Sequence, residues 1–125
     1  MEYKIEIEEY ATQKMIHTTI TGLMSVAERN RVGIETVQKM RDNDVSKVIW
    51  DIREATLDYS LIDSHLVVLN VAALGIKNKD CVAVIYFHNK EQHEHAKTVA
   101  NNRVISNLDY FQNIDDGINW LISKG

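Results

Sequence analysis

The sequence predicts one α/β domain, a mainly parallel five-stranded sheet with one antiparallel edge strand and helices packed on it. Three observations support this prediction. Short apolar segments typical of strands alternate along the chain with amphipathic segments typical of helices. The first two strand-like segments follow each other with no helix between them. The 125 residues include no proline, five glycines and no low-complexity stretch, so residues 1–125 are expected to form a single domain.

The two N-terminal segments predict a hairpin. Tyr3, Ile5 and Ile7 alternate with charged residues, a pattern typical of a half-buried strand. Residues 14–21 are rich in β-branched side chains, and the short connection between the two segments suits a hairpin. The first strand would then be the antiparallel edge of the sheet. Its unpaired backbone groups could pair with a second copy in a homodimer, and its alternating lysine and glutamates could equally block that pairing.

Helices and strands alternate through the rest of the chain. Ser25 and Glu28 form a capping box at the start of the first helix, and Gly75 and Asp115 mark the end of one later helix and the start of another. The resulting order is β-β-α-β-α-β-α-β-α, in which right-handed crossovers produce a mainly parallel sheet. The later strands are predicted over residues 45–52, 81–87 and 104–111, and the helices between them over 61–74 and 90–102.

Two of these helices have a predicted inner face. The helix over residues 90–102 is polar, and only Ala96, Val99 and Ala100 are expected to face the sheet. In the first helix the apolar residues expected to share one face are Ala27, Ile34, Val37 and Met40.

The composition disfavours several classes of partner. The net charge is −4, from 14 basic and 18 acidic residues, so no basic surface for nucleic acid or anionic lipid is expected. No apolar stretch approaches the roughly 20 residues of a membrane-spanning helix, and residues 1–5 do not resemble a secretion signal. A single cysteine excludes an intramolecular disulfide. We therefore expect a cytoplasmic protein.

Catalytic and metal-binding patterns are not found in the sequence. Gly-x-Ser-x-Gly and the glycine-rich phosphate loops are absent, so an enzyme is not expected and neither is a cofactor. His88, His93 and His95 are close in sequence, but His93 and His95 would lie about 200° apart around a helix and could not bind the same ion. The sequence therefore predicts no metal site and places these histidines on a solvated helix face.

A ligand or partner crevice is predicted around the strand over residues 45–52. Asp51 and Arg53 are expected at its carboxyl end, where open α/β sheets bind ligands, and Tyr59 on the rim. Trp50 and Tyr86 could line an apolar pocket under a helix. The alternatives are a structural ion pair between Asp51 and Arg53 and simple core packing of the aromatic side chains.

Three segments of the chain resemble the SpoIIAA-like family, relatives of the STAS domains of anti-sigma-factor antagonists. They are the strand Val48-Ile49-Trp50-Asp51-Ile52-Arg53, the strand Val82-Ala83-Val84-Ile85-Tyr86, and a tail running from Ala100-Asn101-Asn102-Arg103 to Ile118-Asn119-Trp120-Leu121. The resemblance covers nearly the whole chain. It implies a SpoIIAA/STAS-like fold, and fold alone does not determine function.

The resemblance implies a non-enzymatic regulatory or protein-interaction module that signals in the bacterial cytoplasm, with a kinase or an anti-sigma-type regulator as partner. STAS antagonists are phosphorylated at the start of a helix, where this chain has Ser60 and the pair Asp63-Ser64, so Ser60 and Ser64 are the candidate phosphoacceptors. Ser60 could equally serve only as a helix cap. The alternative function is a carrier of a small apolar ligand or lipid, because some SpoIIAA-like proteins look similar to the SEC14 group.

Overall fold

The computed structural model describes residues 1–58, 71–102 and 107–124. Most of the helix predicted over residues 61–74 lies outside these ranges, and its last four residues form a short 3-10 turn, η1. The described elements are β1 (Glu2–Tyr10), β2 (Gln13–Met24), α1 (Val26–Asp42), β3 (Lys47–Leu57), η1 (Val71–Leu74), β4 (Cys81–Tyr86), α3 (Lys90–Asn102), β5 (Leu108–Phe111) and α4 (Ile114–Ser123).

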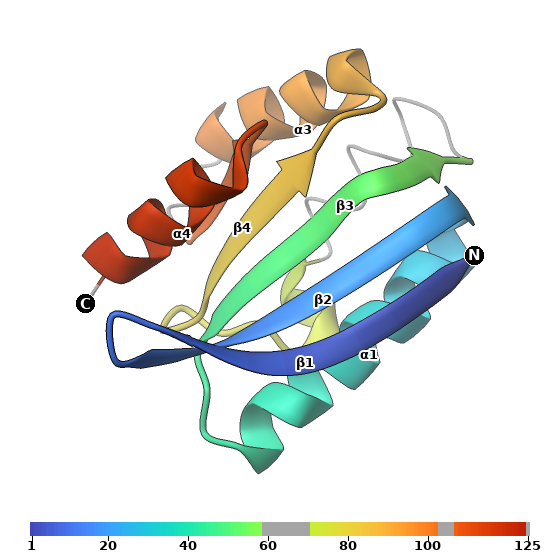
Figure 1. Cartoon of the computed structure of the whole chain (residues 1–125). Coiled ribbons are helices and arrows are strands. Elements are labelled where there is room, and N and C mark those ends of the chain that lie inside the picture. Colours follow the sequence, from blue (N-terminus) through green and yellow to red (C-terminus); the bar gives the residue numbers. More distant parts are fainter. Residues whose placement is uncertain (59–70, 103–106, 125) are drawn as a thin grey trace.

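The described strands form one sheet in the order β1-β2-β3-β4-β5 (Figure 1). β1 pairs with β2 in antiparallel fashion, from Glu2 opposite Thr21 to Tyr10 opposite Gln13. The other three pairings are parallel. This confirms the predicted mainly parallel sheet with one antiparallel edge strand. None of the described helices is long and apolar enough to cross a membrane.

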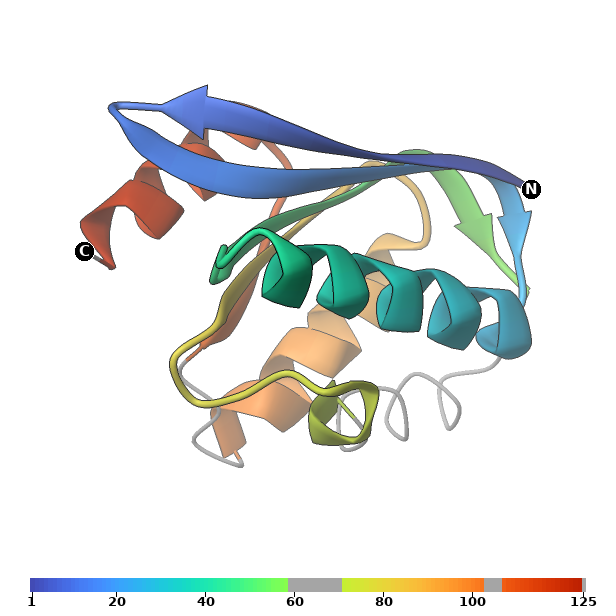
Figure 2. The same ribbon diagram turned by 90° about the horizontal axis from the view of Figure 1, so that it is seen from below.

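Helices cover the two faces of the sheet unequally (Figures 1 and 2). α1 and α3 pack on one face, where Val32, Met40 and Ala96 share an apolar core with side chains of all the parallel strands. α4 packs mainly on β4 and β5 on the other face, with Leu121 against Ile85. That second face is therefore left open over β1, β2 and much of β3.

Close contact between α4 and the sheet depends on Gly117. A Cβ atom at this position would lie 2.5 Å from Cδ1 of the buried Ile85. Asn113 caps the helix, its side chain accepting from the backbone N–H groups of Asp115 and Asp116, so the helix begins earlier than the predicted cap at Asp115.

The capping box that starts α1 is confirmed, but the predicted inner face of this helix is only partly right: Met40 is buried and Val37 packs against the core, whereas Ala27 is exposed. Ser25 accepts a hydrogen bond from the N–H of Glu28, whose side chain accepts from the N–H of Ser25. Ile34, predicted to face inward, is 57% exposed. The helix instead packs polar and small side chains against the sheet, and its buried residues are Arg29, Val32, Gly33, Thr36 and Met40.

Two strands also differ from their predicted form. β3 continues to Leu57, so Asp51 and Arg53 lie within a strand and not at its carboxyl end. In β1, Ile5 packs against the core, whereas Tyr3 and Ile7 are 38% and 41% exposed. Within the described sheet β1 has a neighbouring strand on one side only, so its side chains are less completely covered than those of the central strands.

Candidate functional site

The predicted crevice residues do not form one crevice. Successive side chains of a strand point to opposite faces, so Trp50 joins Tyr86 in the core under α1 and α3, while Asp51 packs on the face of α4. Arg53 pairs with Asp51 on that second face. Tyr59, Ser60 and Ser64 lie outside the described residues. The structure thus contains two separate candidate regions, one on each face of the sheet.

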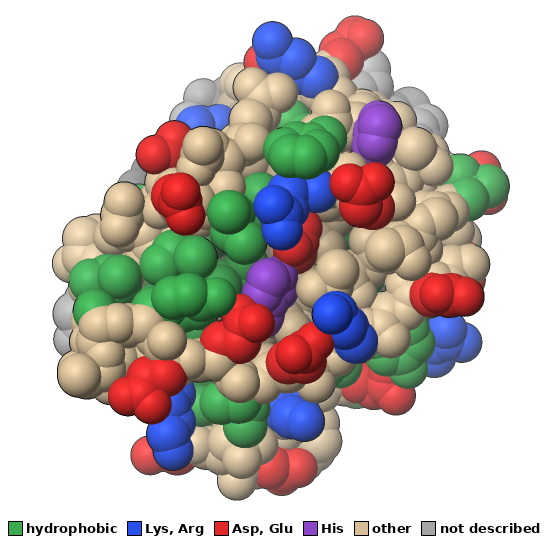
Figure 3. All heavy atoms as spheres, viewed as in Figure 1, with side chains coloured by type: hydrophobic (Ala, Val, Ile, Leu, Met, Phe, Trp, Pro, Cys, Tyr) green, Lys and Arg blue, Asp and Glu red, His purple; other side chains and the backbone are tan. Residues whose placement is uncertain are grey.

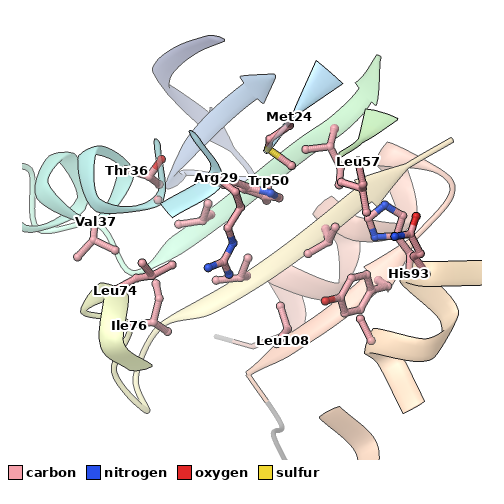
Figure 4. Close-up of a pocket in the computed structure, with 18 residues that line it drawn as sticks. Met24, Arg29, Thr36, Val37, Trp50, Leu57, Leu74, Ile76, His93 and Leu108 are labelled. Atoms are coloured by element: carbon pink, nitrogen blue, oxygen red, sulfur yellow. The ribbon is translucent and has the colours of Figure 1, made fainter. Parts of the chain in front are cut away.

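The first region is a cavity between α1, α3 and the sheet, with η1 at one end (Figure 4). It has a volume of about 80 Å³. An engineered cavity of about 150 Å³ is enough to bind benzene. The cavity is about half that size and partly open to solvent, so a ligand of one ring would have to extend into the opening. Its described walls include Val48, Trp50, Ile52, Leu74, Ile76, Val82, Val84 and Leu108.

His93 lies at one end of this cavity, near Leu57 (Figure 4). The sequence placed it on a solvated helix face, but it is only 6% exposed. Its ring lies beside two tyrosines, with centroid distances of 4.7 Å to Tyr86 and 6.0 Å to Tyr110. Burial lowers the pKa of His93 to about 4, so the imidazole is neutral at pH 7.

Two further polar groups reach the same cavity from α1. Arg29 extends into its middle below Trp50 (Figure 4), and its Nη1 donates to Oδ1 of Asn30 at 2.9 Å. The hydroxyl of Thr36 is hydrogen-bonded to that of Thr18 on β2, at 2.8 Å. A cavity of mainly apolar walls with a few placed polar groups is the usual form of a small-molecule site.

The second region is a hydrogen-bonded charge network on the open face of β1, β2 and β3. His17 is at its centre: Nδ1 lies 2.6 Å from Oε1 of Glu8, and Nε2 lies 2.9 Å from Oδ2 of Asp51. Arg53 donates to both oxygens of Asp51, from Nε at 2.9 Å and from Nη2 at 2.8 Å. Tyr10 donates from its hydroxyl to Glu8 at 2.7 Å. The network therefore joins three strands across the sheet.

The electrostatics of this network favour a protonated His17. Burial alone would lower the pKa of His17, but the hydrogen bonds to Asp51 and Glu8 outweigh burial and raise it. Burial would likewise raise the pKa of Asp51, yet hydrogen bonds from His17 and Arg53 bring it far below its ordinary value. Both ring nitrogens face carboxylates, and only the imidazolium can donate to both. His17 thus has no nitrogen left to act as a general base.

The surface around the network mixes charge with exposed apolar groups (Figure 3). The guanidinium of Arg53 lies 5.9 Å from the ring centroid of Phe87, and this ring is 50% exposed. Leu23, on β2, is 55% exposed. Among the residues that the structure describes, no three His, Cys, Asp or Glu side chains are grouped as metal ligands.

Among the residues of these regions that sequence reasoning missed are Glu8, His17 and His93. Glu8 and His17 are separated in the chain from each other and from Asp51, so no local motif connects them. Their juxtaposition depends on strand pairing, which places Glu6 opposite His17 and His17 opposite Ile49. His93 had a usable signal, since it precedes Ala96 by three residues and so shares its helix face.

No protein-family model and no curated protein matches the chain. Among solved structures it is similar to an uncharacterised protein of the DUF3478 family from Shewanella loihica PV-4, which has a SpoIIAA-like fold. The TM-score is 0.60, with 17% sequence identity over 95% of this chain and 93% of that one. At this identity the likeness shows the fold alone. It confirms the predicted SpoIIAA-like fold.

Proposed function

We propose that this chain is a non-enzymatic binding module that holds a small, mainly apolar molecule between α1, α3 and the sheet. The observation that supports the proposal is the cavity itself, an apolar space with a few polar side chains at defined positions. Its volume of about 80 Å³ favours a ligand of about one ring over the lipid that the SEC14 resemblance suggested. The proposed location is the cytoplasm.

A cavity-filling variant tests this function. Ala96 is 4% exposed and lines the cavity, so Ala96→Met should fill part of it. Thr98→Met adds the same side chain on the exposed side of α3 and is the matched control. We expect toluene to shift amide resonances of the wild type and of Thr98→Met in a saturable way, and those of Ala96→Met much less.

Two results of this titration would contradict the proposal. One is the absence of saturable toluene binding to the wild type. The other is equal affinity in Ala96→Met and Thr98→Met, which would place the bound molecule elsewhere. Amide spectra of each variant without toluene establish that the fold is retained.

The second candidate function is a protein-interaction module of the STAS type. The open sheet face favours it, because Phe87 is half exposed beside the ordered network that contains Arg53. Exposed apolar groups beside organised charge are typical of partner surfaces. Phosphorylation of Ser60 or Ser64 by a kinase stays a prediction, which mass spectrometry of protein purified from its native cells would test.

Phe87→Ala tests the interaction surface. Cross-linking in native cells should recover a specific partner, and recovery should fall with Phe87→Ala. Ile34→Ala is the matched control, because Ile34 is as exposed as Phe87 but lies on α1. If the same amount of partner is recovered with Phe87→Ala and with Ile34→Ala, the open face is not the interaction surface.

A further inference from the structure

His93 is a polar residue that lines the cavity. Its side chain is more than nine-tenths buried, and burial is the only cause of its lowered pKa. In the described part of the chain, the contacts of its ring are those with Tyr86 and Tyr110. No described side-chain nitrogen or oxygen is both sealed from solvent and without a partner, so we take the ring nitrogens to be reachable from the cavity. A polar group of a bound molecule could therefore pair with them.

The aromatic neighbours of His93 hold its ring in place. Tyr86, on β4, and Tyr110, on β5, contact the imidazole from the sheet. A ring held in this way presents its nitrogens in a fixed direction. Binding a ligand therefore costs little conformational entropy at this side chain. The imidazole is neutral at pH 7 and therefore offers one donor and one acceptor.

We infer, on the basis of the proposed function, that the ligand is a small cyclic compound with one neutral hydroxyl group, and that His93 binds this hydroxyl. A hydroxyl both donates and accepts, so it can pair with either tautomer of the imidazole. The ring of the ligand would lie against the apolar walls near Trp50 and Val84. Arg29 is also in the cavity, where its Nη1 donates to Asn30; an anionic probe therefore tests whether Arg29, and not His93, sets the polar preference.

Three probes with the same ring test this inference: toluene, p-cresol and p-toluate. Toluene is apolar, p-cresol carries one neutral hydroxyl group, and p-toluate is an anion at pH 7. His93→Phe keeps the size and planarity of the ring and removes its nitrogens. His88→Phe is the matched control, because His88 is exposed just before α3.

Titrations at pH 7, followed by amide resonances, should show p-cresol binding about 10-fold more weakly to His93→Phe than to the wild type. That factor corresponds to about 1.4 kcal/mol, the contribution of one hydrogen bond. The same substitution should change the affinity for toluene by less than about 2-fold, because it keeps the size of the ring and so the apolar contacts. His88→Phe should bind both probes as the wild type does.

The outcomes separate this inference from the proposed function. If p-cresol and toluene respond equally to His93→Phe, the role of His93 is overturned while the cavity function stands. If p-toluate binds the wild type more tightly than p-cresol, the site selects anions and the neutral-hydroxyl class is overturned. If no probe binds saturably, the proposed function fails as well. Should His93→Phe not fold, the ring 15N shifts of wild-type His93 must change with p-cresol and not with toluene.

Discussion

His17 and His93 have the same side chain, but their pKa values move in opposite directions. Around His17, two carboxylates outweigh burial and raise the pKa. Around His93, burial acts without an opposing charge and lowers it to about 4. A histidine whose pKa is higher in the folded than in the unfolded chain stabilises the fold when it is protonated. A histidine whose pKa is lower in the folded chain stabilises the fold when it is neutral. The two residues therefore give the stability of the protein opposite pH dependences.

The first prediction concerns His93 in acid. The unfolded chain binds a proton at this residue near pH 6.5 and the folded chain near pH 4, so between these values the unfolded state binds more protons. Stability should therefore fall as the pH drops from about 6.5 to 4, by about 3 kcal/mol. Urea unfolding of wild type and His93→Phe across this range should show a shallower decline in the variant. Parallel curves would mean that His93 is not buried as described.

The second prediction concerns His17 in base. Its folded pKa is raised, so its contribution is complete below the unfolded value of about 6.5 and is lost as the pH rises through the folded pKa. His17→Gln should be less stable than the wild type at pH 6, by about 1–2 kcal/mol. The difference should shrink as the pH rises above 7. A constant difference in the midpoint of urea unfolding between pH 6 and pH 9 would contradict a charged His17.

At the scale of elements, the start of α1 shows how local sequence determines a helix end. Ser25 and Glu28 cap each other's backbone groups, and nothing distant in the chain is needed for this contact. The same helix shows where local pattern fails. Ile34 has the spacing of an inward residue but is exposed, while Arg29 and Thr36 are buried. These polar side chains line the cavity. The periodicity of apolar residues in the sequence does not reveal that a cavity lies next to the helix.

The third prediction tests the cap. Ser25→Ala removes the acceptor for the Glu28 N–H and should lower the free energy of unfolding by about 1 kcal/mol. Arg31→Ala, at an exposed position of the same helix, should change it by less than about 0.5 kcal/mol. Thermal unfolding of both variants measures the difference. Equal melting temperatures for the two variants would show that the capping box contributes little.

At the scale of the whole molecule, the sheet separates two regions of different chemistry. The face under α1 and α3 holds the apolar cavity, and the open face holds the charge network. Trp50 and Asp51 are adjacent in sequence, yet they belong to different regions. A molecule in the cavity and a protein on the open face could therefore bind at the same time.

The fourth prediction follows from this separation. His17 and His93 lie on opposite faces, and in residues 1–58, 71–102 and 107–124 they share no hydrogen-bond partner. Mutations at independent sites usually add within about 0.5 kcal/mol. The double variant His17→Gln with His93→Phe should therefore lose the sum of the two single losses in urea unfolding at pH 6. A larger deviation would reveal coupling through the sheet, and with it a route by which ligand binding could affect the open face.

Self-association through the edge of the sheet stays a prediction. Among the described strands β1 is at the edge of the sheet, and its Tyr3 and Ile7 are exposed. We expect the wild type to form a homodimer in sedimentation equilibrium and Ile7→Lys to shift toward the monomer, because added charge on an edge strand opposes pairing. A monomeric wild type at all concentrations would contradict the homodimer.

The sequence by itself determined the order of the described strands and the cap of α1, because these depend on neighbours a few residues apart. The antiparallel edge strand and the parallel core then followed from the short first connection and the longer later ones. The tertiary structure decided which side chains meet. Strand alternation separated Trp50 from Asp51, strand pairing brought Glu8 and His17 to Asp51, and packing of α3 buried His93. These contacts join residues far apart in the chain, and both the shifted pKa values and the cavity arise from them. The candidate sites therefore became visible only in the folded molecule.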